Sequence, residues 1–300
     1  MGTDTVELEV VHRTRYVHLD AASTSHHLLH LTPRDGPWQR TRAHHIDVAP
    51  VPDESIDRHD WFGNPMRIVV LNQPHADFRV EARSRLHLSP RPPLGELDRS
   101  PSWEATAAAL GSPRVDAAPL EARQYLYDSP HVLRGASLAA FARASFPGGR
   151  GVVQGAAALM HRLNDEFTFD PKATDLSTPI DEVLRLRRGV CQDFAHLMIG
   201  CLRSLGLAAR YVSGYVQTWR GDERDRPMVG ADASHAWVSV WCPTHGWIDV
   251  DPTNDCLVDR EHVTLAWGRD FSDVTPVRGV VLGSMQPDPE VAVTVRRIVR

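Results

Sequence analysis

The chain has 300 residues, of which 42% are hydrophobic and 24% charged, and its formal net charge is −5. A mildly acidic chain without a run of lysine or arginine is not expected to bind nucleic acid or a membrane surface. Charges interrupt the apolar stretches of the first twenty residues, and no segment approaches the ~18 apolar residues of a membrane-spanning helix. We therefore expect a cytoplasmic protein, long enough for two domains.

The four cysteines are sparse and form no CxxC pair, which argues against a disulfide framework and against a zinc ribbon. Each is expected to be either a small buried hydrophobe or a reactive thiol. We expect neither a metal ion nor a cofactor. The cysteines are Cys191, Cys201, Cys242 and Cys256.

The first hundred residues contain short alternating or β-branched stretches, separated by turn signals such as Gly63-Asn64-Pro65. Their spacing predicts a small, antiparallel, sandwich-like β domain over residues 1–100. Its clustered histidines lack a matching cysteine or carboxylate spacing, so a solvated surface is favoured over a metal site. The expected strands are Val6–Val11, Tyr16–Leu19, Ala43–Val48, Met66–Leu71 and Phe78–Leu88, and the histidines are His26, His27, His30, His44 and His45.

Residues 89–119 are rich in proline, glycine, serine and alanine, a composition that predicts a linker. From about residue 120, apolar residues recur at helical spacing in Leu120–Leu126, Ser137–Ala144 and Val152–Phe167. We assign residues 115–290 to a second domain, with C-terminal strands that continue to residue 300.

Cys191 stands at the start of a predicted helix, shortly after Gly189. The apolar residues Phe194, Met198 and Leu202 lie on one face of that helix, and Gly206 is placed to end it. Unpaired N–H groups and the positive end of the helix dipole stabilise a thiolate, and the same N–H groups can stabilise an oxyanion. Cys201 lies in the middle of this helix on the apolar face and is better explained as a core residue.

A base and a carboxylate follow in a predicted β-hairpin. His235 begins one strand, and the returning strand carries Asp249 and Asp251 on a single face. We expect Asp251 to meet His235, because Asp249 lies two residues further from registry. A structural histidine and a turn-forming aspartate remain alternatives, but a thiol, an imidazole and a carboxylate in this order supply what nucleophilic catalysis needs.

The segments Gly189–His196, His235–Val238 and Asp251–Asn254 resemble the cysteine, histidine and aspartate motifs of bacterial transglutaminase-like proteins. Residues 268–274 and 276–279 resemble the downstream region of that family, and the N-terminal part is similar to the β domain that often precedes its core. The resemblance implies an α+β fold with a papain-like core. It also implies Cys191 as nucleophile, His235 as acid and base, and Asp251 as the residue that orients His235. Ser239 departs from the glutamate found in many relatives.

The leading functional hypothesis is a metal-independent thiol acyltransferase or hydrolase that acts on peptide or amide bonds, including those of glutamine, through a thioester. Its expected partner is a peptide or protein substrate. The alternatives are an amidase for a non-peptide substrate, a catalytically silent binding or scaffold module, and a metal site built from Cys191, His235 and a carboxylate. The last alternative lacks compact ligand spacing.

Overall fold

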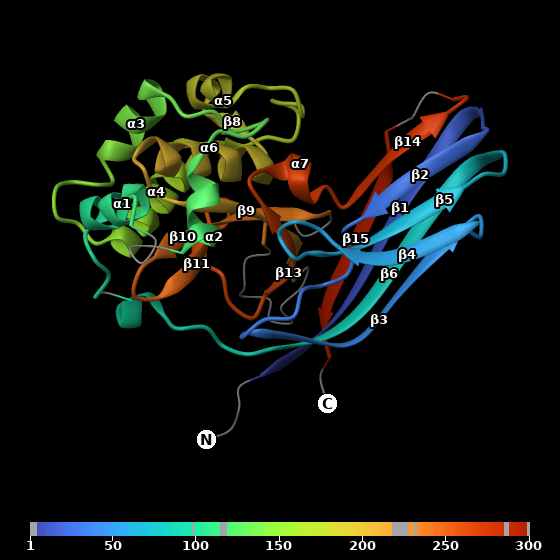
Figure 1. Cartoon of the computed structure of the whole chain (residues 1–300), viewed down its shortest axis with the longest axis horizontal. Coiled ribbons are helices and arrows are strands. Elements are labelled where there is room, and N and C mark those ends of the chain that lie inside the picture. Colours follow the sequence, from blue (N-terminus) through green and yellow to red (C-terminus); the bar gives the residue numbers. More distant parts are fainter. Residues whose placement is uncertain are drawn as a thin grey trace.

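The computed structural model describes residues 5–97, 99–114, 119–217, 228–230, 233–284 and 288–298. It contains a β-sandwich and a five-stranded sheet covered by helices, which lie side by side (Figure 1). The predicted α+β class is confirmed, and so is the β domain at the start of the chain.

The sandwich consists of two four-stranded sheets, with the strand orders β15-β1-β6-β3 and β14-β2-β5-β4. All of their pairings are antiparallel. Alternating apolar side chains from both sheets form a common core, in which Leu71 and Phe78 are fully buried. The strands are β1 Val6–Ala22, β2 Thr24–Leu29, β3 Gln39–Ala49, β4 Glu54–His59, β5 Pro65–Leu71, β6 His75–Leu88, β14 Val277–Leu282 and β15 Glu290–Arg297.

The last two strands of the chain complete this sandwich. β14 pairs with β2, and β15 pairs with β1, so the red strands of Figure 1 lie beside the blue ones. The sequence-based boundaries placed these strands with the second domain, and the pairing corrects that assignment. Arg296 and Glu9 contact each other across 287 residues of sequence, a separation that no local pattern can indicate.

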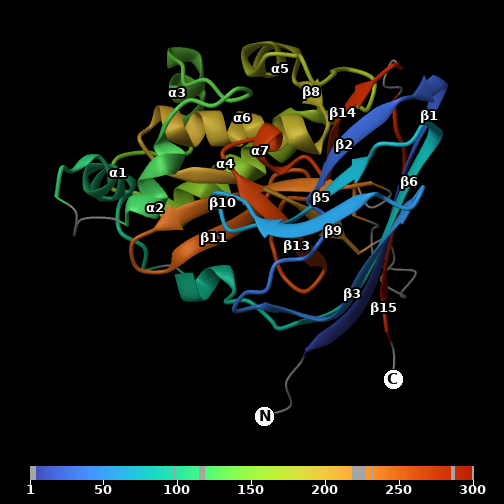
Figure 2. The ribbon, with the colours of Figure 1, turned by 45° about the vertical axis from the view of Figure 1, so that its right-hand side comes forward.

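The second half of the molecule is built on the antiparallel sheet β12-β11-β10-β9-β13. Helices α4 and α6 cover one face of this sheet (Figure 2). Strand β10 presents Ala236 and Val238 to the helical core, whereas Trp237 packs on the opposite face. The strands are β9 Ala209–Val216, β10 His235–Cys242, β11 Gly246–Asp251, β12 Cys256–Leu257 and β13 His262–Gly268, with a short parallel pair, β7 Thr168–Phe169 and β8 Arg188–Gly189.

The predicted helical segments Ser137–Ala144 and Val152–Phe167 correspond to single helices, Leu120–Leu126 is divided into a short helix and a 3₁₀ turn, and a helix was not predicted at Phe271–Val274 or in the expected linker. That segment contains helix α1, whose N-cap Ser102 accepts a hydrogen bond from the N–H of Ala105, and whose residue Leu110 is buried. Residues 89–119 are therefore not a plain linker. The helices are α1 Trp103–Gly111, α2 Leu120–Arg123, α3 Ala136–Arg143, α4 Val152–Glu166, α5 Ile180–Leu186, α6 Cys191–Ser204 and α7 Phe271–Val274, with 3₁₀ turns at Leu94–Leu97 and Gln124–Leu126. Within the described ranges, none of them has the length and apolar character to cross a bilayer.

One long strand, β1, connects the two halves. Its inward side chains alternate from Val6 to His18, so Val10 packs into the helical core and Tyr16 into the sandwich core. Between them lies His12, which is 1% exposed. Its Nδ1 is 2.9 Å from the hydroxyl of Tyr215 on β9, and its Nε2 is 2.7 Å from the hydroxyl of Thr14. A buried imidazole thus bridges the two halves.

Several histidines expected on the surface are buried, which corrects that prediction for His27 and His30. Burial lowers the pKa of His12 and of His27 to about 4. In the unfolded chain the pKa of histidine is ~6.5, so the unfolded state binds more protons between these two values. The contribution of these neutral rings to stability is complete above pH ~6.5 and is lost as the pH falls toward 4.

We therefore expect the melting temperature to fall steadily from pH ~6.5 to pH ~5, with a contribution of up to about 1.4 kcal/mol per pH unit from a histidine such as His12. Thermal unfolding followed by circular dichroism would measure this slope. The variant His12→Gln should flatten it, whereas the same substitution at exposed His45 should not. An identical slope in wild type and His12→Gln would contradict the prediction.

Candidate active site

Cys191 is the first residue of α6, and it is partly exposed. The carboxylate of Asp193 accepts hydrogen bonds from the N–H of Val190 at 2.8 Å and from the hydroxyl of Thr174 at 2.6 Å, which fixes the first turn. A Cβ on Gly189 would lie 2.5 Å from an oxygen of that carboxylate, so the turn requires glycine. The thiol is thereby held at the positive end of a fourteen-residue helix.

His235 is the first residue of β10, and its side chain is fully buried. Its Nε2 lies 2.8 Å from Oδ2 of Asp251, which leaves Nδ1 for the thiol of Cys191. Burial opposes the charged ring, but the negative charge of Asp251, the hydrogen bond to Asp251 and the neighbouring thiol of Cys191 outweigh it and raise the pKa of His235 to about 10. The imidazole is therefore protonated at neutral pH.

The carboxylate of Asp251 is also fully buried, and every donor around it is a nitrogen. Oδ1 accepts from the backbone N–H groups of Thr253 at 2.9 Å and Asn254 at 3.2 Å. Oδ2 accepts from His235, from Nδ2 of Asn254 at 2.7 Å, and from Nε2 of His262 at 3.2 Å. Burial would raise the pKa of this carboxyl, but the charge and hydrogen bonds of the two histidines hold it far below its usual range. The carboxylate is thus ionised and fixed in orientation.

The neighbouring acid, Asp249, serves a different partner. It lies opposite Ser239 in the β10–β11 ladder, and its Oδ2 is 2.6 Å from a guanidinium nitrogen of Arg91. Burial opposes its ionisation, but the charges of Arg91 and Arg210 lower its pKa. The structure thus brings Asp251, rather than Asp249, to His235.

Two further residues of this cluster were not singled out from the sequence as site residues. His262 begins β13, just as His235 begins β10, and its ring packs edge-on against Trp237 at 5.3 Å between ring centres. Asn254 donates to Asp251 and also accepts from the N–H of Val229 at 2.8 Å. The histidine that opens the alternating strand His262–Gly268 is a signal that could have identified the first of them.

The donor atoms of Asp251, Cys256 and His262 lie within 4.8 Å of one another, the one such group of three potential metal ligands in the described part of the chain. Both carboxylate oxygens of Asp251 already accept hydrogen bonds from nitrogen donors. A metal ion here would therefore compete with His235 for the same carboxylate.

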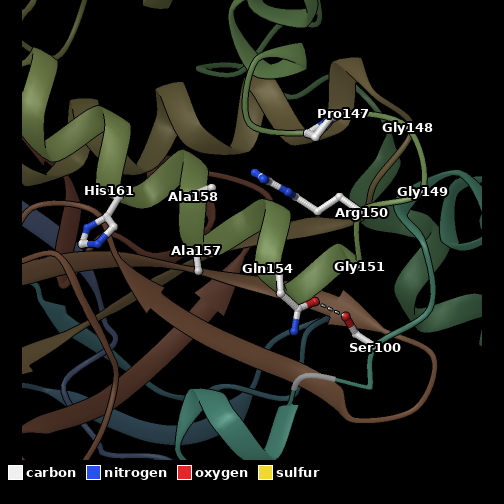
Figure 3. Close-up of a pocket in the computed structure, with 10 residues that line it drawn as sticks. All are labelled: Ser100, Pro147, Gly148, Gly149, Arg150, Gly151, Gln154, Ala157, Ala158 and His161. Atoms are coloured by element: carbon white, nitrogen blue, oxygen red, sulfur yellow. Dashed lines mark hydrogen bonds between the residues drawn. The ribbon is translucent and has the colours of Figure 1, made fainter.

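A wide hollow of about 830 Å³ at the start of α4 has none of these residues in its lining (Figure 3). It is bordered by the glycine-rich turn at residues 147–151. The first N–H groups of α4 are already bonded, because Val152 donates to the carbonyl of Pro101 and Val153 to the hydroxyl of Ser100. This helix start therefore offers those N–H groups to no ligand.

Two family models match the chain in succession. Residues 8–87 match the bacterial transglutaminase-like N-terminal region, and residues 140–252 match the transglutaminase-like superfamily, a segment that contains Cys191, His235 and Asp251. The chain belongs to the transglutaminase-like superfamily. The family resemblance inferred from the motifs is thereby confirmed.

Relatives of full length support this assignment. The chain is 38% identical over 280 residues to an uncharacterized protein of Mycobacterium tuberculosis, covering 91% of this chain and 86% of that protein. It is 30% identical over 292 residues to an uncharacterized protein of Mycobacterium leprae, covering 97% and 99%. A shorter match, 36% over 107 residues, covers 35% of this chain and 16% of a protein-glutamine gamma-glutamyltransferase of Pseudomonas aeruginosa.

The fold is also that of a solved structure, a candidate cysteine protease from Cytophaga hutchinsonii. The two superpose with a TM-score of 0.74 at 17% identity, over 98% of this chain and 91% of that one. The papain-like, transglutaminase-like architecture predicted for the core is therefore confirmed.

We expect Cys191 to be alkylated first among the four thiols, because it is partly exposed and lies beside a protonated imidazole. Cys201 is an internal control, since burial raises the pKa of its thiol to about 12. Brief treatment with limiting iodoacetamide at neutral pH, followed by peptide mass spectrometry, measures the order. His235→Ala should slow the labelling of Cys191. Labelling of Cys242 or Cys256 before Cys191 would contradict this expectation.

Proposed function

We propose that the protein carries out thiol-dependent acyl transfer or hydrolysis at peptide or amide bonds, including the side-chain amide of glutamine. Cys191 is the nucleophile, His235 the general acid and base, and Asp251 the residue that orients His235. The observation that carries the proposal is the buried ring of His235, whose Nε2 is bonded to the carboxylate of Asp251 and whose Nδ1 has no hydrogen-bond partner among the described residues, which leaves it for the thiol of Cys191.

The geometry supports a two-step reaction. The Cys191 sulfur attacks the carbonyl carbon, the C–N bond breaks, and the imidazolium of His235 gives its proton to the leaving amine, which leaves a thioester. In the second step His235 takes a proton from the incoming acceptor, which attacks the thioester carbon and releases the sulfur. Water as acceptor gives hydrolysis, and an amine gives a new amide.

Asp251 favours this cycle in two ways. Its hydrogen bond to Nε2 of His235 directs the other ring nitrogen to the sulfur, and its charge stabilises the imidazolium. The match to the protein-glutamine gamma-glutamyltransferase of Pseudomonas aeruginosa supports amide substrates. The likeness to the Cytophaga hutchinsonii structure supports the fold in which such a site is built.

Cys191→Ala should abolish turnover and leave the melting temperature close to that of the wild type, because a partly exposed thiol contributes little packing. His235→Ala should be nearly as damaging, since nucleophile and base act as a unit. Activity is measured on glutamine-containing peptides by mass spectrometry, as ammonia loss, hydroxylamine incorporation or chain cleavage. Cys201→Ala is the control variant for the turnover measurement, because it removes a buried thiol that is not one of the three proposed catalytic residues. Full turnover by Cys191→Ala on any accepted peptide would refute the mechanism.

Asp251→Asn should lower kcat by about 100-fold or more, because the amide cannot stabilise the imidazolium and favours the wrong ring tautomer. Asp249→Asn is the matched control, with the same chemical change two residues away on the same strand face, and it should cost less than about threefold. Both variants must first be shown to be folded by circular dichroism. Equal losses in the two variants would mean that the wrong carboxylate has been assigned.

A further inference from the structure

A pocket of about 430 Å³ lies where the loop after β2 meets the face of the five-stranded sheet opposite helices α4 and α6. Its walls come from loop residues 34–39, from Arg91, and from Arg210, Trp247 and Trp267 on three different strands. The volume is typical of small-molecule sites. None of the three proposed catalytic residues is part of its lining.

Two arginines of this pocket are stacked on indole rings. The guanidinium carbon of Arg210 lies 4.2 Å from the ring centre of Trp247 and 3.8 Å from that of Trp267, and the guanidinium carbon of Arg34 lies 3.6 Å from Trp267. Arg210 is only 5% exposed, and its ion pair with the more exposed Glu121 is long, at 3.4 Å. Stacking satisfies the faces of a guanidinium but leaves its edge N–H groups as donors.

Three buried nitrogen atoms of the lining have no hydrogen-bond partner among the described residues. They are Nε of Arg34, Nε of Arg210 and Nε2 of His245. Buried donors are normally bonded, and buried charges are normally paired. The carboxylate of Asp249 faces the same pocket but is already bonded to Arg91 at 2.6 Å. The lining carries three arginines and three acids, since Asp35 and Glu121 accompany Asp249, so its charges balance. What distinguishes it is the pair of buried guanidinium Nε–H groups that have no partner among the described residues.

We propose that this pocket binds a carboxylate carried next to a flat apolar group. Guanidinium edges match the two oxygens of a carboxylate, and the indole rings of Trp38 and Trp247 border the pocket and offer apolar surface to an aromatic ring. The C-terminal carboxylate of a peptide ending in an aromatic residue has this chemistry, and so does a free aryl carboxylate. The site goes beyond the proposed acyl transfer and is independent of it.

The test uses the full-length Cys191→Ala protein, so that no turnover can interfere, and measures binding by isothermal titration calorimetry. The probes are N-acetylphenylalanine, its uncharged amide and benzoate. We expect a carboxylate to bind at least about tenfold more tightly than the amide, since hydrogen bonds to a charged group contribute more than neutral ones. Tighter binding of N-acetylphenylalanine than of benzoate identifies a peptide terminus, and the reverse order identifies a free aryl carboxylate.

Arg210→Lys keeps the charge but removes the guanidinium fork, and it should weaken binding by about tenfold. If that variant does not fold, Trp38→Ala tests the same pocket, because Trp38 is 39% exposed at its rim. The matched control is Arg85→Gln on β6, whose side chain is 58% exposed and outside the pocket lining. The proposal is overturned if no carboxylate binds at millimolar concentration, if the amide binds equally well, or if binding is unchanged in the folded pocket variants.

Discussion

The ionised carboxylate of Asp251, completely removed from solvent, is the constraint on which the site depends. A buried charge is stable only if donors surround it, and removing one partner of such a pair typically costs about 3–5 kcal/mol. The donors come from β10, from β13 and from the turn that follows β11. Satisfying one charge therefore fixes three strand ends relative to one another, and the orientation of His235 follows from that.

The same requirement explains where the β-ladder stops. Pairing between β10 and β11 ends at Val238 and Val250, because the chain turns after Asp251 so that two backbone N–H groups reach its side chain. Asn254 then bonds both to Asp251 and to the backbone of Val229. A Cβ on Gly230 would lie 2.5 Å from Nδ1 of His235, so the backbone of Gly230 lies directly against the ring. The group that orients the histidine thus also positions the segment that packs on it.

Local sequence patterns predicted the elements that carry the candidate site residues. A cysteine after Gly189 and before an apolar helical face predicted the start of α6, and strand alternation predicted the hairpin that carries His235 and Asp251. The role of His262 was not predicted, because its contact with Asp251 depends on β13 lying beside β9, which no local pattern encodes. The return of β14 and β15 to the sandwich was missed for the same reason.

The choice between the two acids of β11 illustrates how partners, rather than position alone, assign roles. Asp249, Ser239 and Arg210 lie side by side across three strands on one face of the sheet. Asp249 lies directly across from Ser239 and places a carboxylate on that face. With Arg91 and Arg210 beside it, this carboxylate is already neutralised. Among the described residues, the groups that donate hydrogen bonds to Asp251 are histidines, an amide and backbone N–H groups, so the positive charge that balances it is the imidazolium of His235. Arginine keeps its proton at any working pH, whereas an imidazolium can give its proton away and recover it, so of the two acids it is Asp251 whose partner suits the role proposed for it.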